Sequence, residues 1–130
     1  MKTVSVGKIA QVLSLEILAG ENNLGSKVSK NKAHRPGLEF IGHFDFFPME
    51  RVQVLGLAEI TYLKQLSEEE RKLRIGNIVN YHPPCFIVTR GQEELTYLVQ
   101  YCEQENIPLL RTNDSTYEFI AKLDAYLAKA

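Results

Sequence analysis

The sequence has few cysteines, no surplus of basic residues and no long apolar run. Its two cysteines, Cys85 and Cys102, are too few for a disulfide framework and indicate reduced thiols in a cytoplasmic protein. Fifteen basic residues stand against sixteen acidic ones, a net charge of −1 that argues against nucleic-acid and membrane-surface partners. No apolar run approaches the roughly 18–20 residues of a membrane-spanning helix, and the first residues do not resemble a signal peptide. With 130 residues, 45% of them hydrophobic, we expect one globular domain.

Motifs for catalysis and metal binding are also missing. Residues 20–27 come close to a phosphate-binding P-loop, but Ser26 and Lys27 stand in the reverse of the required order. The three histidines have no partner at metal-ligand spacing. Cys85 and Cys102 lie in apolar segments that are typical of small buried side chains. We therefore expect no catalytic residue, metal or cofactor in this chain, which by itself would not be an enzyme.

Short apolar strands alternate with amphipathic helices along most of the sequence. Strands are predicted near 15–18, 52–55, 85–89 and 107–111, and helices near 6–13, 60–66, 67–79, 95–102 and 115–127. Ser67 and Ser115 each precede a glutamate by three residues, the spacing of a helix-starting capping box. This alternation predicts an α/β fold of three layers, a mainly parallel sheet with helices on both faces.

Polar side chains follow two of the predicted parallel strands. In parallel sheets, ligands bind beyond the carboxyl ends of the strands, where the following helices begin. An anion site is therefore one hypothesis for this rim, and its candidate ligand-binding residues are Arg90, Arg111, Thr112, Ser115 and Thr116. In the alternative, glutamates at 93, 94 and 118 pair with the arginines and Ser115 acts only as a cap. Charged side chains at the rim of a sheet are usually solvated or only weakly paired, which favours the second hypothesis.

An aromatic cluster precedes the strand at 52–55. Phe44, Phe46 and Phe47 either cover the core or form an interface with a partner, since exposed aromatic side chains are common interface anchors. The sequence leaves these two interpretations equally open.

Four blocks of the sequence resemble a known family. The block Arg-Pro-Gly-Leu-Glu at 35–39 is followed by Glu-Arg-Val-Gln-Val-Leu-Gly at 50–56, and further matches lie at 84–91 and 107–112. In this order they resemble the N-terminal domain of bacterial HPr kinase/phosphorylase over essentially the whole chain. The resemblance implies that 1–130 is a single N-terminal domain, with a fold similar to the N-domain of a murein ligase.

The resemblance also implies a function. The parent enzyme phosphorylates a serine of HPr, a carrier protein of sugar transport, and reverses this by phosphorolysis, which regulates carbon use in the bacterial cytoplasm. It is usually a hexamer, and its P-loop, which uses ATP and magnesium, lies in a C-terminal kinase domain absent from this chain. We therefore expect a non-catalytic regulatory or assembly domain whose partners are that kinase domain and further copies of the protein. The alternative is a module that senses a phosphorylated metabolite or a nucleotide at the rim.

Overall fold

Four strands form the main sheet, in the order β2–β6–β5–β4. The structure, a computed structural model, describes residues 3–130. Strands β4 (Gln53–Leu55), β5 (Phe86–Val88) and β6 (Leu109–Arg111) are parallel, and β2 (Glu16–Ala19) lies antiparallel to β6 at one edge. A separate antiparallel pair joins β1 (Val4–Ser5) to β3 (Lys27–Val28). The mainly parallel sheet is as predicted, whereas the antiparallel edge and the small second sheet were not foreseen.

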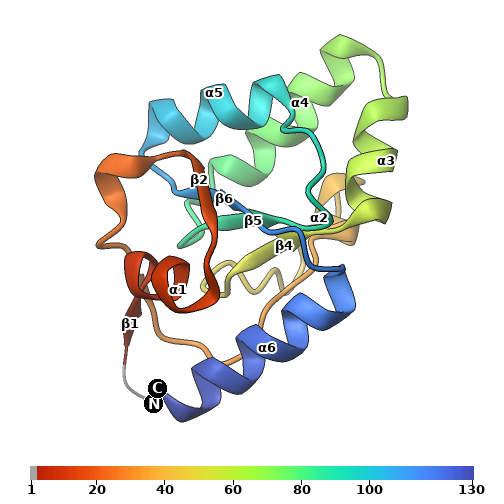
Figure 1. Cartoon of the computed structure of the whole chain (residues 1–130). Helices are drawn as coiled ribbons and strands as arrows, with labels where there is room; N and C mark the ends of the chain where they lie inside the picture. The colour runs from red at the N-terminus through yellow and green to blue at the C-terminus, as the bar shows by residue number, and fades with distance from the viewer. Residues whose placement is uncertain (1–2) are drawn as a thin grey trace.

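Helices cover both faces of the main sheet (Figure 1). On one side lie α3 (Leu57–Gln65), α4 (Glu68–Val79) and α5 (Thr96–Glu105), and on the other lie α1 (Val6–Leu13) and α6 (Thr116–Lys129). Two short elements complete the order, the 3-10 turn η1 (Glu21–Asn23) and α2 (Gly37–Phe40). The prediction of three layers is confirmed.

The central strands bury side chains on both faces, which explains their continuous apolar sequence. In β5, Phe86 and Val88 pack into the core beneath α3, α4 and α5, while Ile87 packs into the core beneath α1 and α6. All three side chains are fully buried. Burial on both faces is what a central parallel strand requires, and it leaves little room for polar residues before the strands end.

The helix boundaries follow local sequence signals. The Ser67 hydroxyl accepts from the Glu70 amide at 3.1 Å, and the Ser115 hydroxyl accepts from the Glu118 amide at 3.3 Å. Asn106 ends α5 in the left-handed conformation, with φ of 55°. The predicted caps at Ser67 and Ser115 are thus confirmed for the half of each box in which serine accepts from the glutamate amide. The cap at Ser115 fixes the start of α6 beside the carboxyl ends of the parallel strands.

Truncation of a side chain in this core should cost far more stability than truncation at the surface. Leu109→Ala removes a fully buried side chain and should lower the free energy of unfolding by about 2–5 kcal/mol. Leu38→Ala, at a side chain that is 64% exposed, should change it by less than about 0.5 kcal/mol. Urea unfolding of both variants measures the difference, and equal losses would contradict the assigned core.

Candidate functional site

The chain turns sharply between β4 and α3 at Gly56, beside the start of α6. A Cβ atom at Gly56 would lie 2.6 Å from both Arg35 Nη2 and Thr116 Oγ1, so a side chain here would displace these two hydrogen-bonded groups. Glycine is therefore needed here for close packing. We call the group formed by Arg35, Gly56, Glu59, Thr89 and Thr116 the Gly56 corner.

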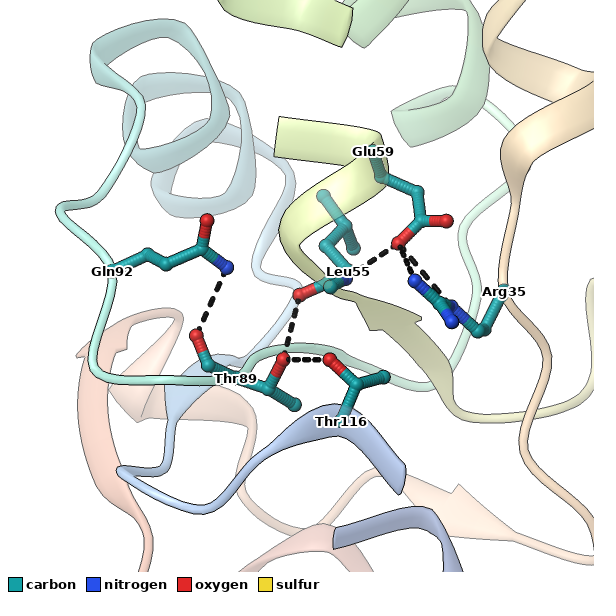
Figure 2. Close-up of polar contacts among 7 residues, drawn as sticks. Arg35, Leu55, Glu59, Thr89, Gln92 and Thr116 are labelled. Atoms are coloured by element: carbon teal, nitrogen blue, oxygen red, sulfur yellow. Dashed lines mark hydrogen bonds and ion pairs between the residues drawn. The ribbon is translucent and has the colours of Figure 1, made fainter. Parts of the chain in front are cut away.

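Glu59 is the buried carboxylate of this corner, in the first turn of α3. Its Oε1 accepts from the Gly56 amide at 2.6 Å and from Arg35 Nη2 at 2.9 Å and Nε at 3.3 Å (Figure 2). Only 8% of Glu59 is exposed, so its charge depends on these partners and on the positive end of the helix. Glu59 therefore fixes the position of the Arg35 guanidinium.

Two buried threonines connect α6 to the strands. The Oγ1 atoms of Thr89 and Thr116 lie 2.6 Å apart, and Thr89 Oγ1 also donates to the Leu55 carbonyl at 3.4 Å (Figure 2). Since a carbonyl only accepts, both contacts are satisfied when Thr116 donates to Thr89 and Thr89 donates to Leu55. Gln92 Nε2 donates to the Thr89 carbonyl at 3.0 Å. Helix α6 is thereby joined to the ends of β4 and β5.

An open depression of about 600 Å³ lies beside the Gly56 corner. Its walls come from the segment before α2, from α3 along its length, from the first turn of α6, and from the turn after β5. Its lining includes two arginines, two tyrosines, a leucine and a threonine, namely Arg35, Arg90, Tyr62, Tyr117, Leu57 and Thr116. A smaller depression of about 280 Å³ adjoins it and shares Arg35, Thr116 and Tyr117.

Arg111 lies away from this depression, among carboxylates near the β2 edge. Its Nε and Nη2 donate to the two carboxylate oxygens of Glu16 at 3.0 Å each, and Nη1 donates to Glu94 at 2.9 Å. The hydrogen bonds to Glu16 raise the pKa of Arg111. Glu94 was foreseen as a possible partner, but Glu16 was not. The structure therefore does not bring Arg90 and Arg111 together at one opening.

The other three predicted rim residues have different surroundings. Thr112 Oγ1 accepts from the Asp114 amide at 3.2 Å, and the Thr112 carbonyl accepts from the Gly91 amide at 2.8 Å. Ser115 caps α6, and of the three only Thr116 lines the depression. Thr112 and Ser115 thus shape the loop, and anion binding by any of the five residues stays a prediction.

Comparison with known proteins identifies the family. The family model described as HPr Serine kinase N terminus matches residues 4–127. The chain belongs to this family. It is 59% identical over 99% of its length to a protein of Oceanobacillus iheyensis provisionally named HPr kinase/phosphorylase 2, and 32% identical over 98% of its length to HPr kinase/phosphorylase of Bacillus cereus. It spans 42% and 41% of those two proteins, so this chain of the HPr kinase N-terminal family covers about two fifths of such relatives.

A solved structure shares the fold of this HPr kinase N-terminal chain. It is the regulatory region of Clostridium perfringens pyrophosphatase, with CBS and DRTGG domains, complexed with its activator diadenosine tetraphosphate. The TM-score is 0.62 at 14% identity, covering 95% of this chain and 46% of the other. At this identity the likeness supports the α/β fold alone.

The aromatic cluster of this HPr kinase N-terminal chain divides into packed and exposed members. Phe44 stacks on Tyr81 with ring centroids 4.8 Å apart, and Phe47 meets the same ring edge-on at 5.3 Å. Phe46 is fully exposed and has a φ of 61°. Phe44 and Phe47 therefore cover part of the core. An interface role for the cluster stays a prediction.

The thiols are buried in the described part of the chain. Burial raises the pKa of Cys85 to about 12 and also raises the pKa of Cys102, so both stay protonated at neutral pH.

Within residues 3–130 no group of three or more His, Cys, Asp or Glu side chains is placed to hold a metal ion. In the same residues no helix has the length and apolar character to cross a membrane.

Sequence reasoning missed Arg35, Tyr62 and Tyr117 as neighbours of Arg90. Arg35 stands in the Arg-Pro-Gly-Leu-Glu block that carried the family resemblance, yet that block gave no indication of its partner. The pairing with Glu59 spans 24 positions and depends on how α3 is placed. The usable signal was the glycine that ends β4, because glycine at that point predicts a close approach by another segment.

Replacement of Gly56 should be costly because the added methyl group meets atoms of the corner. Gly56→Ala should lower the free energy of unfolding by about 1–3 kcal/mol. Gly25→Ala is the matched control, since no atom lies within 4 Å of a Cβ built there, and it should change stability by less than about 0.5 kcal/mol. Chemical denaturation of both variants measures the two free energies of unfolding. An unchanged value for Gly56→Ala would rule out the packing described.

Proposed function

We propose that this chain is the non-catalytic N-terminal regulatory or assembly domain of a bifunctional HPr serine kinase/phosphorylase. The observation that carries the proposal is the match to one family over residues 4–127, combined with 59% identity to a relative of which this chain spans only 42%. More than half of that relative lies outside the matched segment. Its catalytic chemistry would lie in that remaining part.

In this proposal, ATP and magnesium bind the C-terminal kinase domain, and HPr is the substrate of the whole protein. The parent enzyme controls carbon catabolite regulation in the bacterial cytoplasm. The partners of this chain are the kinase domain and further copies of the same protein in a homo-oligomer. The names of the relatives support the kinase and HPr, while the oligomer and the location follow from the family resemblance alone.

The polar groups at the carboxyl ends of the strands support a structural role for this region. Glu59 is occupied by Arg35 and the Gly56 amide, and Arg111 is occupied by Glu16 and Glu94. The Thr89 and Thr116 hydroxyls bond to each other. Groups engaged in this way hold the starts of α3 and α6 and are not free to bind a substrate.

A ligand-sensing module is a second candidate function. The observation that favours it is the depression beside the Gly56 corner, which is lined by Arg35 and Arg90 and by no carboxylate. Such a module would bind an anion and change how the domain acts on its parent enzyme.

The isolated chain should not transfer phosphate from ATP and magnesium to HPr, since it lacks the Lys and hydroxyl pair of a P-loop. Phosphoryl transfer is measured with labelled ATP. A chimera in which this chain replaces the matched segment of the Oceanobacillus relative should phosphorylate HPr and assemble as that relative does.

The control for the chimera is the same relative without its matched segment. Altered activity or altered assembly in this truncated protein, restored by the chimera, is the expected result. Label transfer by the isolated chain would show that it is catalytic. A truncated protein identical to the intact relative in rate and oligomeric state would contradict a regulatory or assembly role.

A further inference from the structure

The depression beside the Gly56 corner carries positive charge without a carboxylate at its surface. Arg35 and Arg90 line it, and none of its lining residues is acidic, although the whole chain has a net charge of −1. Arg90 is exposed and forms no ion pair among residues 3–130. The unpaired Arg90 guanidinium, in a depression that Arg35 also lines, favours an anionic ligand.

Arg35 is already held in place for such a ligand. Its Nε and Nη2 donate to Glu59 behind the depression, and 43% of its side chain remains exposed. Nη1 has no hydrogen-bond partner in the part of the chain that is described. A guanidinium fixed by a buried carboxylate loses little conformational entropy when it binds a further anion.

Aromatic and apolar side chains lie beside the two arginines. Tyr117 is 86% exposed at the start of α6, while Tyr62 and the half-exposed Leu57 stand on α3. The exposed Tyr117 ring and the partly buried Tyr62 ring provide faces for stacking a flat ring. The volume of about 600 Å³ lies within the range of roughly 300–1,000 Å³ found for small-molecule sites.

We propose that this depression binds a phosphomonoester joined to a flat aromatic ring, that is, a mononucleotide-like ligand. Arg35 and Arg90 bind the phosphate, and Tyr117 and Tyr62 contact the ring. This inference rests on the second candidate function, the ligand-sensing module, and names its ligand, but it does not depend on the proposed role in an HPr kinase. Binding is measured on the isolated chain, so its failure and the failure of the proposed function are distinguishable.

The test is titration of the ¹⁵N-labelled chain with adenosine 5′-monophosphate, followed by amide chemical shifts. Adenosine, inorganic phosphate and glucose 6-phosphate are titrated separately. We expect saturable shifts at the depression with a Kd of about 1 mM or tighter. The other three compounds should bind at least about fivefold more weakly, because each lacks the charge or the flat ring.

Two variants and one control locate the site. Arg90→Gln should weaken binding of the mononucleotide at least about fivefold, and Tyr117→Ala should weaken it without changing the weak effect of inorganic phosphate. Arg51→Gln, at an arginine that lines neither depression and forms no ion pair within residues 3–130, should leave binding unchanged.

Four results would overturn the proposal. They are no saturable shift with the mononucleotide at millimolar concentration, shifts confined to another part of the chain, equal weakening by Arg51→Gln and Arg90→Gln, and binding of glucose 6-phosphate or phosphate as tight as that of the mononucleotide.

Discussion

The hydrogen bond from the Gly56 amide to the buried Glu59 carboxylate holds the Gly56 corner together. It joins the end of β4 to the first turn of α3, and the same oxygen accepts from Arg35. A carboxylate buried without such partners would cost several kcal/mol, so the partners and the carboxylate require one another. The direction of the Arg35 side chain follows from this contact, while the buried side chains of Ile60 and Leu63 place α3 on the sheet.

The depression exists because four segments meet at this corner without filling it. Helix α3 contributes Leu57 and Tyr62, α6 contributes Thr116 and Tyr117, the segment before α2 contributes Arg35, and the turn after β5 contributes Arg90. The absence of a side chain at Gly56 allows Arg35 and Thr116 to approach β4. The hydrogen-bonded Gly56 corner thus lies beside the aromatic side chains. Its contacts hold the helices on the sheet and also shape the surface that is available to a ligand.

Elements with local signals were predictable from the sequence, while partners across the fold were not. The strands at 52–55, 85–89 and 107–111 and the caps at Ser67 and Ser115 depend on residues within one turn or one strand. Arg111 instead pairs with Glu16, 95 positions earlier, because β2 adds an antiparallel edge next to β6. No pattern in the sequence indicates that β2 pairs with β6 in the antiparallel direction. The sequence could therefore predict the rim arginines but not the side chains that pair with them.

Hydrogen exchange at the Gly56 amide tests the central role of the Glu59 contact most directly. If this corner is as firmly held as described, the amide opens only when the whole domain unfolds. Its exchange free energy should then equal the global free energy of unfolding measured under the same conditions. Exchange of the Gly56 amide by local fluctuation, at a free energy near that of the loop amide of Gly25, would contradict the account.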